Sequence, residues 1–390
     1  MRSDSPLVLQ VLVFALVTAA FTTIYITQPV LPVLRQEFAA GATQASFTIA
    51  AVILGIALSN LPFGMLADRC PIKPIILTGG VVVAGCGLLS AAASSLPLLI
   101  AARFVQGLFI PALTTCLAAF LARRLPAASL NLVMGSYVSA TVAGGLGGRL
   151  LGGWLHPPFH WRYALVSASI LVLAATLAAV LGLPRERPGT DTDSPAAARP
   201  PGFAKLMARR DLARIYLVAF TALFVFSSLF NYLPFYLTAP PFSMRTETIT
   251  LIYLVYVTGI IIGPFAGNLA GRLGDGPTTA LGAAVFALSI GLTLIPYAAA
   301  VAVSLVGVCT GFFTIHAAAA GSLNRRLTAS RGRANSLYVL FYYLGGASGI
   351  ALGGQAFRLA GWGGVAALGC GVLALPFTVG VLEWRRQKRG

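Results

Sequence analysis

The chain has 390 residues, of which 57% are hydrophobic and only 9% are charged, and its formal net charge is +17. Because a soluble globular domain carries roughly 25% charged residues, this composition excludes a water-soluble body of such a size. Most of the chain is therefore expected to lie in a lipid bilayer.

Apolar runs of about 20 residues are typical of membrane-spanning helices, and twelve of them follow one another along the chain. They cover residues 9–33, 44–66, 75–95, 98–121, 131–154, 162–183, 212–238, 248–270, 278–298, 300–323, 334–356 and 362–383. The ten-residue alternation that marks the strands of a membrane barrel is absent. The predicted fold class is an all-α membrane protein with 12 transmembrane helices.

Basic residues are distributed very unequally between the two sides of these spans. If the amino terminus is placed inside the cell, the arginines of the outer loops are only Arg35, Arg162, Arg245 and Arg358. This bias follows the positive-inside rule and predicts a bacterial-type inner-membrane protein with both termini in the cytoplasm. Together with attraction to anionic lipid headgroups it accounts for the net charge, so no nucleic-acid partner is predicted.

A segment rich in proline and charge, residues 184–211, separates six spans from six spans and is predicted to be a cytoplasmic linker. It divides the chain into residues 1–183 and residues 212–390. Short motifs recur in order in both parts: "FTTIYITQP" (21–29) resembles "FSSLFNYLP" (226–234), and the glycines of 144–153 recur at 345–354. A repeat of six spans predicts two pseudo-symmetric six-helix bundles that rock against each other around a central substrate.

Three motifs of the first half carry a family resemblance. They are "GMLADRCPIKPI" at 64–75, "LIAARFVQGL" at 99–108 and "GGLGGRLLGGW" at 144–154. Together they resemble the motifs of the major facilitator superfamily, a family of secondary transporters. With "GFFTIHAAA" at 311–319 and "NSLYVLFYYLGG" at 335–346, the chain is similar to the YnfM-like branch, which is of drug- or sugar-efflux type.

The first motif implies a gate on the cytoplasmic side. In the family the acid of this loop docks on the opposite half and holds the gate shut, close to a helix amino end whose dipole favours a carboxylate. The motif departs from the family at residues 71–72, and the second half has Gly271 where the acid is expected. A tight turn with solvated charges is the alternative. The residues that match the gate motif are Gly64, Asp68, Arg69 and Lys73.

The third motif is typical of the family's antiporters, except that Arg149 replaces a proline. Its glycines recur every four residues and form one smooth stripe, which lets another helix approach closely. This stripe is expected to seal the two halves against leak. The glycines of the stripe are Gly144, Gly148 and Gly152.

Arg149 itself lies off this stripe, near the periplasmic end of the fifth span. Candidate counter-charges at that level are Glu37 and Glu247. We hypothesise that an Arg149–Glu247 pair latches the periplasmic side; an arginine that extends to the membrane interface is the alternative.

Any Asp or Glu near a predicted span lies at its end, as Glu383 does, whereas Arg103 and His316 fall inside spans. A histidine binds and releases protons near physiological pH, so His316 with Arg103 is the candidate for proton coupling; a hydrogen-bonded packing role is the alternative. A basic, aromatic cavity disfavours cations. The candidate substrate-binding residues are Tyr25, Gln28, Arg103, Phe230, Asn231, Tyr232, Tyr338 and Tyr342.

The predicted function is proton-coupled export of a small amphipathic compound, neutral or anionic, by a monomer that uses no cofactor or metal. Its alternative is proton-coupled uptake or exchange of an organic anion or sugar. A membrane enzyme is disfavoured because the zinc-protease, nucleophile-elbow and phosphate-loop motifs are absent. A channel or a non-transporting sensor is disfavoured by the repeat and by the gate motif.

Overall fold

The computed structural model describes residues 6–67, 69–184, 202–327 and 331–387, and within these residues it contains helices and turns but no strand. The first half of the described chain comprises α1 (Pro6–Tyr25), α2 (Leu31–Glu37), α3 (Ala42–Ala67), α4 (Ile72–Ala91), α5 (Leu96–Leu113), α6 (Thr115–Arg124), α7 (Ala127–Trp154) and α8 (Trp161–Gly182). The second half comprises α9 (Phe203–Ala208), α10 (Arg210–Thr238), α11 (Thr246–Ile252), the 3₁₀ helix η1 (Tyr253–Val257), α12 (Thr258–Leu273), α13 (Asp275–Leu292), α14 (Ala298–Arg325) and α15 (Arg331–Gln387).

Helices are the expected elements, because lipid offers no water to the backbone N–H and C=O groups and a helix satisfies them internally. In the described part of the chain, ten helical segments are long and apolar enough to cross a membrane. The last one holds two spans, since α15 is interrupted at Ala360 and Gly361, where glycine adopts a φ of 58°. The 28-residue α7 provides a further span. The predicted architecture of twelve spans is thus confirmed.

Three predicted spans are not single helices. The first, predicted over 9–33, ends at Tyr25, where the chain turns before α2 begins. The fourth is divided into α5 and α6 at Thr114, three residues after Pro111. The eighth is interrupted by η1, and a 3₁₀ turn within a helix often accompanies a functional site. These breaks bring side chains of the spans into positions that a continuous helix would not give them.

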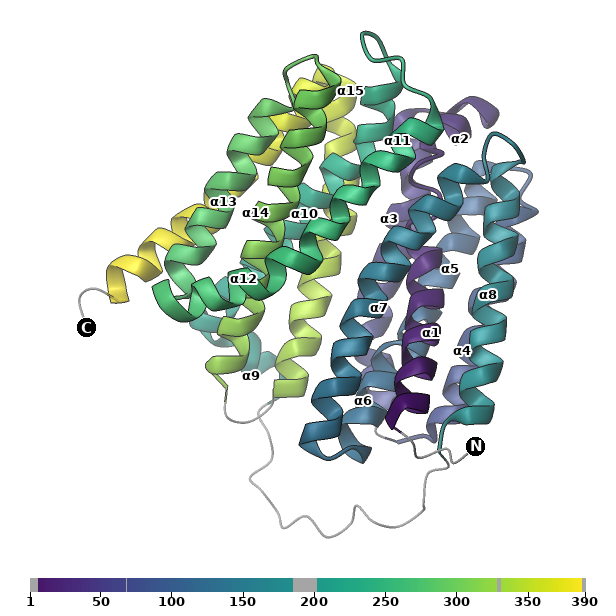
Figure 1. The fold of residues 1–390 in the computed structure, drawn as a ribbon, viewed down its shortest axis with the longest axis vertical. Helices are drawn as coiled ribbons and strands as arrows, with labels where there is room; N and C mark the ends of the chain where they lie inside the picture. The colour runs from purple at the N-terminus through teal and green to yellow at the C-terminus, as the bar shows by residue number, and fades with distance from the viewer. Residues whose placement is uncertain (1–5, 68, 185–201, 328–330, 388–390) are drawn as a thin grey trace.

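The helices on the two sides of residues 185–201 form two groups that lie side by side (Figure 1). Within the first group α1 packs on α7 and α3 on α5, and within the second α10 packs on α15 and α13 on α14. Between the groups α3 packs on α15, while α7 packs on α11 and η1. The short helix α9 lies inside the predicted linker, with Leu206 buried; the linker boundaries and the division into two domains stay predictions.

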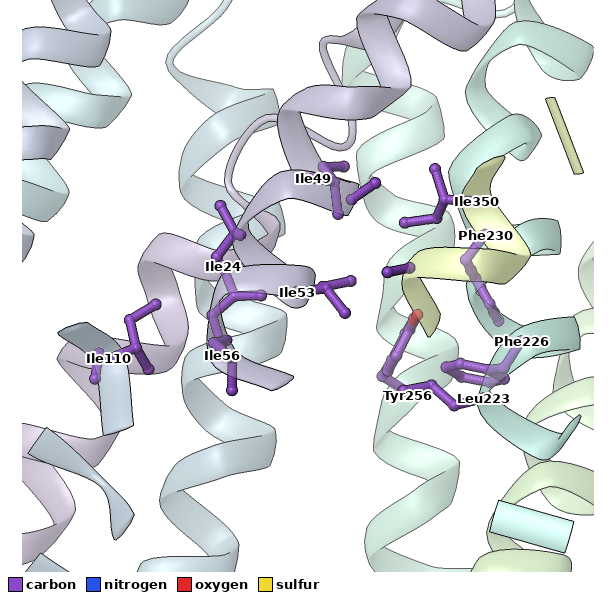
Figure 2. Close-up of a cluster of buried hydrophobic side chains, with 14 of the residues drawn as sticks. Ile24, Ile49, Ile53, Ile56, Ile110, Leu223, Phe226, Phe230, Tyr256 and Ile350 are labelled. Atoms are coloured by element: carbon purple, nitrogen blue, oxygen red, sulfur yellow. The ribbon is translucent and has the colours of Figure 1, made fainter. Parts of the chain in front are cut away.

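The two ends of the molecule are named after the helices α2 and α6. The α2 end carries α2, the end of α7 and the start of α11, and the α6 end carries α6 and α9 (Figure 1). Apolar side chains of both groups approach each other in a buried cluster, where Ile49 and Ile53 of α3 lie on one side and Ile350 of α15 lies on the other (Figure 2). The interior between the two groups is therefore walled by aliphatic and aromatic groups.

The glycine stripe packs against α1. A methyl group added at Gly148 would lie 2.1 Å from the carbonyl oxygen of Thr22, and one at Gly152 would lie 1.8 Å from that of Ile26. Gly144 meets the carbonyl of Thr18 in the same way. The expectation that this stripe seals the two halves is wrong, because its partner belongs to the same half.

Candidate functional site

Arg149 lies at the centre of the contact between the two halves near the α2 end. Its side chain is only 2% exposed, and three N–H groups are engaged. Nε donates to Oε1 of Gln28 at 2.6 Å, Nη1 to the carbonyl of Gly145 at 2.6 Å, and Nη2 to the hydroxyl of Tyr256 at 3.0 Å. Gln28 and Gly145 belong to the first half and Tyr256 to the second, so this one cation connects the halves.

Aromatic rings enclose the same guanidinium group. Its carbon lies 4.0 Å from the ring centre of Tyr25, 4.1 Å from that of Tyr256 and 5.5 Å from that of Tyr253. A cation over an aromatic face gains about 0.5–2 kcal/mol, more when water is excluded. Side chains three apart in a 3₁₀ helix eclipse each other, and for that reason η1 presents both tyrosines to α7. We call Tyr25, Gln28, Arg149, Tyr253 and Tyr256 the Arg149 cluster.

The predicted Arg149–Glu247 pair is not formed. Glu247 instead pairs with Arg245, with 2.8 Å between Oε1 and Nη2. The reason is the antiparallel register of α7 and α11, which is set where Gly153 packs on Thr250. Arg149 lies four residues inward of that contact and Glu247 three residues outward, which separates them by about 10 Å along the axis. An arginine in a helix also points towards the helix amino end, here away from Glu247.

Glu37 likewise stays within the first half. It accepts hydrogen bonds from Arg162 and from Nε1 of Trp161 (2.5 Å), and His160 lies 3.6 Å away. Burial alone would raise the pKa of Glu37, but the hydrogen bonds from Arg162 and Trp161 outweigh it and hold that pKa below its usual value. Glu37 therefore ties α2 to the start of α8 and offers Arg149 no counter-charge.

Arg103 is fully enclosed in the first half, at 0% exposure. It donates to the carbonyls of Ile24 (2.8 Å) and Thr48 (3.3 Å) and to the side chain of Gln106. It joins α5 to α1 and α3, and it does not reach the second half. These acceptors satisfy Arg103 within the first half, while its predicted substrate and proton roles stay predictions.

His316 lies among aromatic side chains of the second half. Its Nδ1 is 3.0 Å from the hydroxyl of Tyr338, and its ring lies 6.0 Å from Phe312 and 5.1 Å from Tyr342, centre to centre. His316 and Tyr342 are partly exposed. The structure thus brings together one predicted proton-coupling residue and two predicted substrate-binding residues.

A continuous series of rings joins the side chains around His316 to the Arg149 cluster. Tyr256 lies 5.4 Å from Phe226, and Phe226 stacks on Phe312 at 3.9 Å, beside His316. Phe230 packs on Tyr256 at 4.8 Å. The histidine and the arginine, which come from different halves, therefore border one aromatic core.

The other predicted residues of α10 differ from one another. Tyr232 donates to the carbonyl of Ile350 at 2.8 Å and stacks on Phe357, which makes it a packing residue between α10 and α15. Asn231 is 0% exposed, and neither of its side-chain polar atoms has a hydrogen-bond partner. A buried amide without partners is costly and is unusual in a structural role.

Charges of opposite sign meet only near the helix ends in the part of the chain that the structure describes. At the α6 end Arg325 pairs with Asp275, and Arg326 with Glu383 at 3.0 Å. Neither Arg103 nor Arg149 forms an ion pair with a described carboxylate. Arg149 is therefore a buried cation between the halves that no described carboxylate neutralises.

Comparison with known proteins identifies the family. The model of the Major Facilitator Superfamily matches residues 13–349. The chain belongs to the major facilitator superfamily. It is 29% identical over 372 residues to the inner membrane transport protein YnfM of Escherichia coli, covering 94% of this chain and 88% of that one. The uncharacterized MFS-type transporter YybF of Bacillus subtilis is 28% identical over 370 residues, with 93% and 91% covered.

Solved structures of the superfamily share the fold. A bacterial homologue of the human lysosomal transporter Spinster, in an inward-facing and occupied conformation, superposes with a TM-score of 0.74 at 15% identity, over 100% of this chain and 97% of that one. The human organic anion transporter MFSD10 gives 0.73 at 17% identity, over 97% and 100%. This superfamily member is thus a multi-pass membrane transporter, and as its relatives are named transporters it is not an enzyme.

The superfamily's loop motif is described only in part. Asp68 lies outside the described residues, while Arg69 is exposed and Lys73 partly so at the α6 end. Gly64 faces open space, with Thr115 4.0 Å from a methyl group added there. The gating role of these residues stays a prediction.

Tyr253 and Tyr256 were missed by the sequence analysis. A signal was available, because two tyrosines lie three residues apart in "YLVYV" within a predicted span, and a buried tyrosine hydroxyl usually needs a partner. Their relation to Arg149 was not predictable, since it depends on how two distant helices align.

Proposed function

We propose that this transporter exports a small amphipathic compound, neutral or anionic, in exchange for protons across a bacterial inner membrane. The inequality of basic residues between the loops supports an orientation in which the α6 end faces the cytoplasm and the α2 end faces outward. In that orientation the closed contacts around Arg149 form the outer gate, and substrate enters from the cytoplasm.

The observation that carries the choice of substrate is the buried guanidinium of Arg149. It lies between the halves with neutral acceptors only, and a charge without a counterion in a membrane interior is costly. A cationic substrate would increase that cost, whereas an anion or a hydrogen-bonding neutral compound would reduce it. The surrounding tyrosine and phenylalanine rings suit an apolar or aromatic body.

Proton coupling is assigned to His316. It is partly exposed, it is bonded to Tyr338, and the ring series through Phe312 and Phe226 connects it to Tyr256. Its protonation would add a second positive charge to a core that already holds Arg149. Repulsion from Arg149, whose guanidinium keeps its charge, then favours loss of the proton from His316.

Export is tested with inside-out membrane vesicles energised by respiration, whose interior corresponds to the periplasm. The probes are 1-naphthalenesulfonate, its neutral sulfonamide and 1-naphthylmethylammonium. We expect the sulfonate or the sulfonamide to accumulate and a protonophore to abolish accumulation. His316→Gln is expected to lose gradient-driven accumulation but to keep substrate exchange. Accumulation of the ammonium probe alone would refute the substrate assignment.

The alternative is proton-coupled uptake or exchange of an organic anion or sugar. It is favoured by the same arginine, which would act as a direct ligand, and by the likeness of the fold to a transporter named for organic anions. In this case the sulfonate would accumulate in right-side-out vesicles and not in inside-out ones.

A further inference from the structure

The three hydrogen bonds of Arg149 differ in what happens to them when the halves separate. Gln28 and Gly145 lie in the same half as Arg149 and move with it. Tyr256 lies in the other half, so the bond from Nη2 to its hydroxyl must break. Opening of the α2 end therefore leaves Nη2 without an acceptor, in a site still lined by Tyr25.

A phenol is a weak acceptor for a buried cation. The bond from Arg149 to Tyr256 is charge-assisted on the arginine side only. An anionic oxygen adds a Coulombic attraction that a neutral phenol lacks, so it would bind Nη2 better than the Tyr256 hydroxyl does. The phenol accepts from one N–H of Nη2, and an incoming anion that takes this N–H must displace the phenol. They consequently compete for it.

We propose that the Tyr256 hydroxyl occupies the position of an anionic oxygen of the substrate on Arg149, so that substrate binding releases this contact and opens the α2 end. The inference rests on the proposed function for the direction of entry and narrows the substrate to anions. No other mechanism is needed, because a ligand that binds the open state more tightly than the closed state shifts the equilibrium towards the open state. In the closed state the Tyr256 hydroxyl fills the position on Arg149 that the substrate would take, and in the open state this position is free.

Neighbouring contacts make the bond a suitable latch. Gly153, one turn beyond Arg149, packs so tightly on Thr250 that an added methyl group would lie 1.8 Å from its Oγ1. The packing excludes water from the bond, and it brings Thr250 to 0% exposure. A thiol at position 250 is therefore expected to react only when the α2 end opens, which provides a direct readout.

The experiment uses the full-length protein in detergent with Cys70→Ser and Thr250→Cys. Cys70 is the one exposed cysteine, whereas the other four are buried or partly buried. The rate of labelling by a polar maleimide is measured with 1-naphthalenesulfonate and 1-octanesulfonate, with their neutral sulfonamides, and with 1-naphthylmethylammonium. No proton gradient is present, so the result is independent of the export assay.

We expect the sulfonates to accelerate labelling several-fold and the neutral and cationic probes to leave it unchanged. Tyr256→Phe should accelerate labelling about tenfold without any probe, as loss of one charge-assisted hydrogen bond implies, and should abolish the response to sulfonates. The matched control is Tyr236→Phe, which removes a hydroxyl that bonds to the carbonyl of Thr293 inside the second half. This variant should label at the parent rate.

Three outcomes would overturn the proposal. They are a parent-like rate in Tyr256→Phe, equal acceleration by Tyr236→Phe, and no acceleration by either sulfonate. A failure of export with the labelling response intact would refute the proposed direction of transport and leave the latch standing. Normal export without a labelling response would refute the latch and leave the proposed direction of transport standing.

Discussion

Gly153 of α7 packs directly against Thr250 of α11, and Gly354 of α15 packs in the same manner against Thr43 of α3. A methyl group added at Gly153 would lie 1.8 Å from Oγ1 of Thr250, and one at Gly354 would lie 2.6 Å from Oγ1 of Thr43. Each half thus offers a glycine near the end of its fifth span to a threonine of the opposite half. These reciprocal contacts close the α2 end on both sides of a pseudo-twofold axis.

Gly153→Val is expected to open the α2 end, since the added methyl groups cannot fit against Thr250. The closed state should lose about 1–3 kcal/mol, as is usual for overpacking. The thiol-labelling rate at a cysteine in position 43, on the opposite contact, measures the opening. A rate equal to that of the parent would show that the Gly153 contact does not hold the halves together.

Gly152→Ala should destabilise the whole protein instead, because its neighbour is the backbone carbonyl of Ile26 in the same half. A backbone atom cannot yield as a side chain does, so we expect a clear fall in the melting temperature. Gly147→Ala is the matched control on the same helix, where the added methyl group would lie 3.8 Å from Oγ1 of Thr22. If both variants have the same melting temperature, the close approach of α7 to α1 is not what stabilises this bundle.

Asn231→Leu is expected to raise thermal stability and to reduce transport at least tenfold. The gain arises because a buried amide with no partner among the described residues costs about 1–3 kcal/mol. Transport is expected to fall because the Asn231 amide is a candidate ligand of the substrate. Ser228→Ala is the control, since Ser228 is also buried with an unpartnered Oγ on the same helix. Transport by Asn231→Leu at the rate of Ser228→Ala would remove Asn231 from the substrate site.

The Glu37 contact predicts a pH dependence of stability. The pKa of Glu37 is lowered in the folded state, so its stabilisation is present above the unfolded value of about 4.3 and is lost as the pH falls through the folded value. Because Glu37 and Arg162 are each 29% exposed, we expect the effect to be about 1 kcal/mol or less. The difference between the melting temperatures at pH 7 and at about pH 2.5 should be smaller in Glu37→Gln than in the parent, because the stabilisation is lost only below the unfolded pKa. An undiminished pH difference would contradict this assignment.

Composition and periodicity determined much of the architecture. The twelve spans and the resemblance between the halves could be predicted, because each follows from local hydrophobicity or from repetition along one chain. For Arg149 the sequence left two interpretations open, a pair with Glu247 and an arginine that extends to the membrane interface. It further indicated that the stripe of Gly144, Gly148 and Gly152 lies against a helix.

The identity of those partners was decided only by the tertiary structure. Arg149 bonds to Tyr256 and not to Glu247, and the glycine stripe meets α1 and not the second half. The physical reason is common to both. Hydrophobicity fixes which face of a helix is buried, whereas the axial alignment of two helices distant in sequence depends on the summed packing of every other contact between them. A shift of about two turns, roughly 11 Å, would be needed to bring Glu247 to the level of Arg149.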